Sequence, residues 1–240
     1  EMGKEISLMR DQKEDYQYEE AIKTLRTNIQ FSGTNLQVIM LTSAVPNEGK
    51  SEISFSLASS LAQIDNRVLL IDADVRKSVL VTRYKLDRKI EGLSQYLSGQ
   101  KKLEEVIYTA NIPNLDVIFS GPLSPNPAEL LEEPLFKKLI DHAREEYAYV
   151  IIDTPPMSTI IDGAIVAGHC DGAIMVVESG GVSYRVLQKV KRQLERSGCR
   201  ILGTVLNRVN MQVQGYYRYY GKYGRYHYVY GYGYGRENKK

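Results

Sequence analysis

Cysteine is scarce in this sequence. Cys170 and Cys199 are the only two among 240 residues, and their spacing matches no zinc-binding motif. So few cysteines in a chain of this length are typical of a protein kept in a reducing compartment. Long apolar runs are also missing, because no stretch reaches the roughly 20 apolar residues that span a bilayer, and the N-terminal residues do not form a signal peptide. These absences favour a cytoplasmic protein with no membrane-spanning segment.

The remaining composition is that of a globular chain. With 43% hydrophobic and 25% charged residues, it suits one α/β domain with a sizeable core. The net charge of +2 is unevenly distributed: residues 211–240 contain six Lys or Arg and one Glu, which leaves +5 on this tail and −3 on the other 210 residues. A basic tail on an acidic body can contact acidic surfaces.

A strand, a loop and a helix follow one another near the start of the chain. The apolar run Leu36–Leu41 predicts the strand, and a helical pattern follows the loop. Between them, Gly49, Lys50 and Ser51 have the context of a phosphate-binding loop, in which Gly lets the backbone close on a phosphate, Lys reaches it from the loop surface and Ser ligates Mg²⁺. The alternative is a plain strand-to-helix turn, because Ala44 stands where the general motif has glycine.

Two further predicted strands end in aspartate. Arg67–Ile71 runs into Asp72 and Asp74, and Tyr149–Ile152 runs into Asp153. The carboxyl ends of strands are the edge at which open α/β sheets bind ligands. In an extended conformation Asp72 and Asp74 would point the same way, which suits a divalent cation, whereas the alternative is a polar turn. The hydrophobic strand that ends in Asp153 is the Walker B arrangement, which holds Mg²⁺ or its water.

The alternation of elements predicts the fold class. We expect an α/β protein of the P-loop NTPase kind, with a parallel β-sheet, right-handed crossovers and helices that flank both faces. Further strands are predicted at Leu115–Phe119, Gly172–Val177 and Arg200–Leu206, and helices at Tyr18–Phe31, Leu93–Leu97, Leu103–Tyr108, Ala128–Glu146 and Ser183–Arg196.

Three segments divide the chain: a flexible N-terminus over residues 1–14, the P-loop domain over 15–210 and a disordered tail over 211–240. Nothing in the tail could form a core, because tyrosine alternates there with Gly and basic residues. The bland interpretation is a low-complexity tail that associates with other tails or with sugars. With a kinase domain attached, the exposed hydroxyls become phosphate acceptors: Tyr216, Tyr217, Tyr219, Tyr220, Tyr223, Tyr226, Tyr228, Tyr230, Tyr232 and Tyr234.

Four segments and the tyrosine cluster together resemble the bacterial tyrosine kinases of capsule and exopolysaccharide synthesis. Ser43–Ser51 resembles that family's Walker A motif, Leu70–Arg76 its second Walker A-like motif, Val150–Pro156 its Walker B motif, and Ser120–Leu130 a further family segment. The resemblance covers nearly the whole chain. It implies an ATP- and Mg²⁺-dependent kinase that phosphorylates the tyrosines of its own tail.

The resemblance also implies roles for single residues. Asp72 is expected to accept the tyrosine proton, and Asn207 to contact adenine. The nucleotide-binding set is Glu48, Gly49, Lys50, Ser51, Glu52 and Asn207, the metal set is Ser51, Asp72, Asp74 and Asp153, and the catalytic set is Lys50, Asp72, Asp74 and Asp153.

Assembly and partners follow from the same resemblance. Glu20, Lys23 and Arg26 are similar to an oligomerisation motif that has Arg at the position of Lys23, so a ring-like homo-oligomer is expected, with a weaker fork at that position. The expected partners are a membrane adaptor that activates the kinase, a tyrosine phosphatase and other protein substrates, with no nucleic acid. The chain is then expected to be cytoplasmic and bound to the inner face of the plasma membrane through the adaptor, or to be a cytoplasmic fragment of a membrane-spanning kinase.

Two other functions remain open. A partition- or septum-site-type ATPase would use hydrolysis to switch dimerisation, but such proteins carry an extra Lys early in the phosphate loop, and residues 44–47 contain none. A non-catalytic regulator that only senses nucleotide is the other alternative.

Overall fold

The computed structural model describes residues 4–8, 16–78, 80–84, 86, 90–158 and 161–209. The chain divides into two units, Glu1–Asn207 and Arg208–Lys240. The tail tyrosines lie outside the described residues. Among the helices that the structure describes, none combines the length and apolar character needed to cross a membrane.

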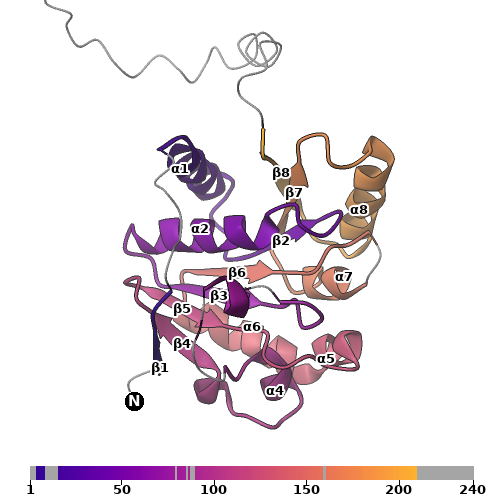
Figure 1. Cartoon of the computed structure of the whole chain (residues 1–240). Helices are drawn as coiled ribbons and strands as arrows, with labels where there is room; N and C mark the ends of the chain where they lie inside the picture. The colour runs from indigo at the N-terminus through magenta and orange to yellow at the C-terminus, as the bar shows by residue number, and fades with distance from the viewer. Residues whose placement is uncertain are drawn as a thin grey trace, which may run out of the picture. The chain divides into compact units, whose positions relative to one another are not determined.

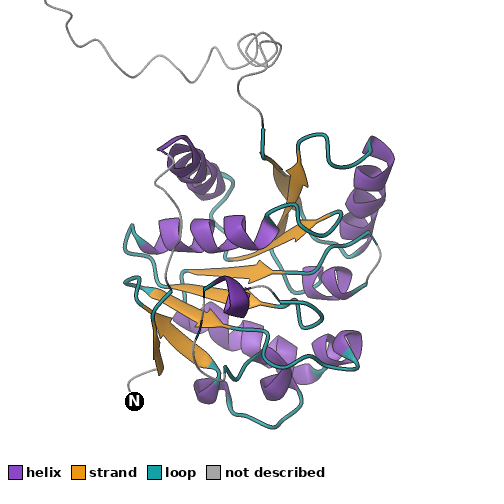
Figure 2. Cartoon of the chain, in the orientation of Figure 1, coloured by secondary structure: helices purple, strands orange, loops and turns teal. Residues whose placement is uncertain are grey.

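A single sheet organises the first unit (Figures 1 and 2). Its strands lie in the order β1-β4-β5-β3-β6-β2-β7-β8, and all neighbours are parallel except β4 and β5. β3, β6 and β2 are therefore adjacent at the centre. The strands are β1 (Lys4–Ile6), β2 (Val38–Ser43), β3 (Val68–Asp72), β4 (Ile107–Ala110), β5 (Leu115–Ile118), β6 (Tyr149–Asp153), β7 (Gly172–Glu178) and β8 (Ile201–Asn207).

Helices cover both faces of the sheet. Strand residues alternate between two cores: Ile39 and Leu41 of β2 pack with α1 and α2, whereas Val38 and Met40 pack against the opposite set of helices (Figure 1). Because both faces are buried, the central strands are continuous apolar runs. The helices are α1 (Tyr16–Phe31), α2 (Lys50–Ala62), α3 (Leu80–Arg83), α4 (Leu93–Leu97), η1 (Leu103–Glu105, a 3₁₀ turn), α5 (Pro127–Glu132), α6 (Pro134–Glu146), α7 (Asp162–Ala167) and α8 (Tyr184–Arg196).

Most predicted elements are confirmed within a few residues, but four expectations are wrong. The helix expected over Ala128–Glu146 is split, because Pro134 begins α6 and cannot continue the i to i−4 hydrogen bonds of α5. The helix expected over Leu103–Tyr108 is η1 followed by β4, and β4 runs antiparallel to β5, so the sheet is not wholly parallel. Residues 4–6, expected in a flexible N-terminus, form β1 beside β4.

Asp171 ties three elements together at the amino ends of the strands. Its carboxylate accepts hydrogen bonds from the main-chain N–H groups of Gln37 and Val38 at 3.0 and 2.7 Å, and it pairs with Arg144 of α6 through Nη1 at 2.9 Å and Nη2 at 2.7 Å. Removing one member of such a network leaves the other groups without their partner.

Asp171→Ala should therefore lower the free energy of unfolding by about 2–4 kcal/mol. The measurement is urea denaturation at pH 7. Asp141→Ala is the matched control, because Asp141 forms an exposed i, i+4 pair with Lys137 and should change stability by less than about 0.5 kcal/mol. Equal effects of the two substitutions would show that Asp171 does not hold these elements together.

Candidate active site

Three segments with the predicted motifs meet at one edge of the sheet. β2, β6 and β3 are adjacent and parallel, so their carboxyl ends lie side by side. The phosphate loop follows β2, Asp72 ends β3 with Asp74 two residues beyond it, and Asp153 ends β6. The strand order thus brings together residues that the sequence separates by about a hundred positions, from Lys50 to Asp153.

The phosphate loop leads into the start of α2. Asn47 and Gly49 both have left-handed backbone angles, with φ of 68° and 85°. A side chain at Gly49 is also excluded by space, since its Cβ would lie 2.1 Å from Nδ2 of Asn207. The first N–H groups of a helix have no partner within the helix, and its dipole favours an anion there. The start of α2 therefore has the form of a phosphate site, and phosphate binding by these residues remains a prediction.

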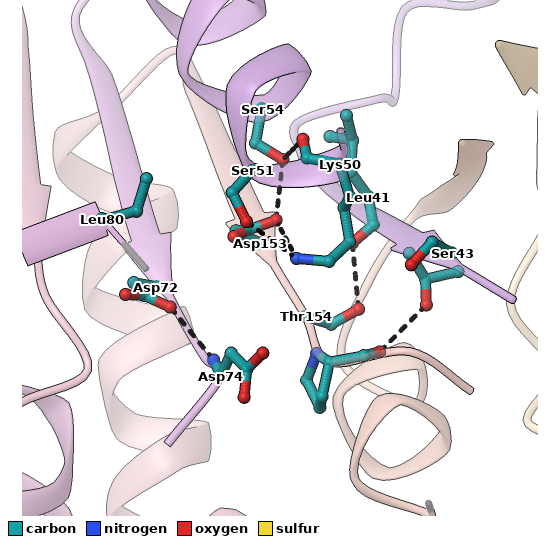
Figure 3. A network of polar contacts seen from close by, with 12 residues as sticks. Leu41, Ser43, Lys50, Ser51, Ser54, Asp72, Asp74, Leu80, Asp153 and Thr154 are labelled. Atoms are coloured by element: carbon teal, nitrogen blue, oxygen red, sulfur yellow. Dashed lines mark hydrogen bonds and ion pairs between the residues drawn. The ribbon is translucent and has the colours of Figure 1, made fainter. Parts of the chain in front are cut away.

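Lys50 is buried beside Asp153 rather than exposed at the loop surface (Figure 3). Its Nζ lies 2.5 Å from Oδ1 of Asp153 and donates to the Ser51 hydroxyl at 3.2 Å. The Ser54 hydroxyl donates to the same carboxylate oxygen at 3.0 Å. The expectation of a surface lysine is thus wrong: the strand order closes β6 against α2, and the Asp153 carboxylate attracts the ammonium group.

Asp72 is the last residue of β3, and Asp74 lies just beyond the strand (Figure 3). The N–H of Asp74 donates to Oδ1 of Asp72 at 3.2 Å, and the Ser78 hydroxyl donates to the other oxygen. The Asp74 carboxylate accepts the N–H of Lys77 at 3.0 Å. After Asp72, the chain therefore leaves the extended conformation that the sequence predicted and forms a side chain-to-backbone turn that carries Asp74.

The electrostatics of the site favour protonation of Asp72. Burial raises its pKa to about 7, and the neighbouring Asp153 adds to the increase, while the Ser78 hydroxyl and Lys50 oppose it. Burial also raises the pKa of Asp74. Several carboxylates and one ammonium group leave this buried site with an excess of negative charge when the carboxylates are ionised. A bound cation would therefore be favourable there.

The donor set fits a magnesium ion that arrives with its nucleotide. Within the part of the chain that the structure describes, no three His, Cys, Asp or Glu side chains form a ready-made metal cage. Mg²⁺ does not need one, since it usually binds one or two carboxylates, water and substrate phosphates. Ser51 and the carboxylates of Asp72, Asp74 and Asp153 supply such oxygen ligands. Their role as metal ligands remains a prediction.

Several residues that contact the predicted site residues were not predicted from the sequence. Ser54 lies one helical turn after Lys50, so it faces the same way, and that spacing was the available signal. Ser78 follows the Asp72 turn by a few residues and carried no signal of its own. Arg76 binds the fully buried Asp162 through two bonds of 2.6 and 2.9 Å, which fixes the turn to α7. That partner is 86 positions away and could not be found from spacing.

The other predicted residues lie at varied places. Asn207 ends β8 beside the phosphate loop, where its Nδ2 donates to the carbonyl of Glu48 at 2.8 Å. In α1, Glu20 and Lys23 form an exposed pair of 2.7 Å. Arg26 instead donates to the carbonyl and hydroxyl of Ser60 in α2, at 3.0 and 3.1 Å. The structure therefore does not gather the three predicted oligomerisation residues into one exposed patch.

Comparisons with known proteins agree with this geometry. Residues 36–197 match the family model of an AAA domain. The chain is 44% identical over 207 residues to the tyrosine-protein kinase CpsD of Streptococcus agalactiae, which covers 86% of this chain and 90% of the relative. It is 38% identical to the tyrosine-protein kinase YwqD of Bacillus subtilis, over 84% of this chain and 86% of the relative.

Solved structures give the same result. The kinase domain of the Escherichia coli tyrosine kinase ETK superposes with a TM-score of 0.77 at 32% identity, covering 90% of this chain and 80% of that one. The septum site-determining protein MinD of Pyrococcus horikoshii superposes with a TM-score of 0.62 at 22% identity, covering 74% and 72%. The second likeness shows a shared fold alone.

The raised pKa of Asp72 predicts a pH-dependent cost to stability. The pKa is about 7 in the folded protein against 3.8 for an ordinary aspartate, so the folded state binds the proton more tightly. The resulting stabilisation is complete below pH 3.8 and is lost as the pH rises through 7. Asp72→Asn carries no charge and keeps an acceptor for the Asp74 N–H. It should raise the Tm of the protein in EDTA at pH 8, by about 2–4 °C for each kcal/mol gained, and by less at pH 5.5.

Calorimetry at both pH values checks this prediction. Asp141→Asn, an exposed position, should leave the Tm unchanged at both. A gain for Asp72→Asn that is the same at pH 5.5 as at pH 8 would contradict the raised pKa.

Proposed function

Since the chain belongs to the bacterial tyrosine-protein kinases, we propose that it transfers the γ-phosphoryl group of ATP to tyrosines of its own tail at the edge formed by β2, β3 and β6. The observation that carries this proposal is the convergence of Lys50, Asp153 and Asp72 beside the start of α2. Phosphoryl transfer needs placement and charge neutralisation rather than covalent help from the protein, and these residues supply both.

The residues have separate roles in the step. The tyrosine oxygen attacks the γ-phosphorus, the bond to the oxygen that bridges the β- and γ-phosphates breaks, and ADP leaves. Asp72 accepts the phenolic proton, since a pKa of about 7 is close to that of an effective base at neutral pH. The Lys50 ammonium group neutralises charge on the phosphates. Magnesium, when bound by Ser51 and the aspartates, supplies further neutralisation.

The tail has the reach and the chemistry of a substrate. Tyr216 lies nine residues beyond Asn207, the end of β8, so an extended linker spans about 30 Å. That reach allows transfer within one chain or to a neighbour.

A ring would hold each tail at high concentration beside the next site, which favours transfer between chains. About three phosphates, at roughly −1.5 to −2 charges each, would cancel the tail's +5 and weaken its attraction to the acidic body.

The wider setting is proposed on the family resemblance. It comprises a ring-like assembly that includes α1, activation by a membrane adaptor at the inner face of the plasma membrane, removal of phosphate by a tyrosine phosphatase, and control of capsule or exopolysaccharide synthesis and export. Asn207 is proposed to contact adenine through the part of its side chain not used by the Glu48 carbonyl.

The partition-type ATPase is the weaker alternative. The likeness to MinD extends to the fold, but the loop carries no early lysine, and the N–H of Val45 is taken by the Glu48 carboxylate at 2.9 Å. The identity to tyrosine kinases over most of the chain favours the kinase.

Lys50→Met should reduce phosphotyrosine formation by about 10²–10³-fold, because the phosphate-bound cation is lost. It should also cost about 3–5 kcal/mol of stability, because Asp153 is left buried without its partner. Labelled ATP, Mg²⁺ and phosphotyrosine detection give the rate, and circular dichroism at the assay temperature gives the folded fraction. Lys138→Met, at an exposed position on α6, is the control and should keep the parent rate. A folded Lys50→Met protein that labels at the parent rate would show that the site is misassigned.

Transfer between chains is tested by mixing two variants, neither of which can phosphorylate its own tail. One carries Lys50→Met and an intact tail, and the other is active but ends at Asn210. We expect the intact tail to gain phosphotyrosine, at a rate that rises with the concentration of the truncated chain. If it stays unlabelled while the parent labels at a rate independent of dilution, transfer occurs within one chain.

A further inference from the structure

Glu48 places a buried carboxylate inside the phosphate loop. The residue is 1% exposed, and its two oxygens accept three main-chain hydrogen bonds. Oε2 accepts the N–H groups of Ala44 and Val45 at 2.7 and 2.9 Å, and Oε1 accepts the N–H of Glu178 at 3.0 Å. The first two donors begin the loop and the third ends β7, so one side chain joins the loop to the next strand of the sheet.

A carboxylate is an unfavourable group to find there on charge alone. The loop precedes a helix start that suits an anion, and a negative side chain repels a triphosphate. Its three hydrogen bonds explain its presence, because a carboxylate only accepts, and its bonds to N–H groups are stronger than those of neutral acceptors. The residues on either side, Asn47 and Gly49, both have positive φ. The loop therefore has an unusual backbone that an internal tie can hold.

Asn207 holds the same peptide from the other side. Its Nδ2 donates to the Glu48 carbonyl at 2.8 Å and fills the space next to Gly49. In a trans peptide the C=O and the following N–H point in opposite directions. A fixed Glu48 carbonyl thus aims the Gly49 N–H away from Asn207. The side chain of Glu48 and that of Asn207 together fix the peptide between them to the ends of β7 and β8.

We infer that Glu48 is a positioning residue for ATP, whose carboxylate holds the phosphate loop in its binding shape before the nucleotide arrives. This inference rests on the placement of ATP proposed above. A loop already in its bound shape does not lose conformational freedom on binding, so the tie strengthens ATP binding although its charge opposes it. Asn207 shares this role through the Glu48 carbonyl.

The two effects of Glu48 have opposite signs, which makes the inference testable. Glu48→Gln removes the negative charge, and on electrostatics alone ATP would bind more tightly. The carboxamide nitrogen cannot accept an N–H, so the same substitution breaks part of the tie and leaves buried donors unsatisfied. We expect the second effect to win, with the KM and Kd for ATP raised about tenfold or more and kcat changed by less than about threefold.

The experiment compares Glu48→Gln with the parent and with Glu132→Gln, a matched substitution at an exposed position of α5 that should leave both constants unchanged. Calorimetric titration of ATP at saturating Mg²⁺ gives Kd, and tail phosphorylation gives KM and kcat. A Kd for Glu48→Gln that is equal to or lower than that of the parent overturns the inference. Lys50→Met distinguishes a wrong role for Glu48 from a wrong ATP site. If Lys50→Met binds ATP with the Kd of the parent, the proposed ATP site itself is wrong.

A further measurement on the parent protein keeps the inference testable if Glu48→Gln folds poorly. Amide hydrogen exchange of the nucleotide-free parent should show protection at Ala44, Val45 and Glu178, and rapid exchange at these amides would overturn the inference. If Glu48→Gln folds, a double-mutant cycle adds a test of Asn207: Glu48→Gln and Asn207→Ala together should raise KM by less than the product of the single effects, because both act on one peptide. Full multiplicativity would show that Asn207 does not share the role.

Discussion

The buried pair between Lys50 and Asp153 is the interaction on which the rest of the site depends. Asp153 contacts all the motifs at once: its carboxylate accepts from Lys50 and Ser54 of α2, and its carbonyl accepts the N–H of Ala73 at 2.8 Å. The phosphate-loop helix and the aspartate turn are thereby held against the end of β6. A buried carboxylate left without these donors would be costly, so the three segments are fixed relative to one another whenever the sheet forms.

The same crowding of carboxylates changes the protonation of the site. The carboxylates of Asp72, Asp74 and Asp153 all interact with the Lys50 ammonium group, and the pKa of Asp72 is raised to about 7 because burial and the Asp153 charge disfavour its ionised form. Such an arrangement costs stability in the free protein. Bound cations and phosphates would compensate this cost, and a pKa near 7 is the proton affinity that the proposed role of Asp72 as base requires at neutral pH.

The positions of the site's supports follow from strand order. Ser78 and Asp162 orient the turn that carries Asp72 and Asp74, and Glu48 and Asn207 hold the phosphate loop. Each of these contacts, except that of Ser78, joins segments that are far apart in the sequence. Rigid strands that end at one edge bring the segments to hydrogen-bonding distance, so the loops between strands carry the chemistry while the sheet fixes their spacing.

The sequence by itself determined the buried strands, the phosphate loop and the two aspartate motifs, because continuous apolar runs and the residues after them are local features. Pro134 also indicates the start of a new helix, but the apolar residues on both sides of it keep helical spacing and predict one continuous helix. Only the tertiary structure decided that β4 runs antiparallel to β5, that Lys50 is buried against Asp153, and that Arg26 turns to Ser60. The Glu48 carboxylate meets Glu178 across 130 positions and its carbonyl meets Asn207 across 159. Such contacts depend on which strands become neighbours and on where each side chain then points, and neither is encoded in a local pattern.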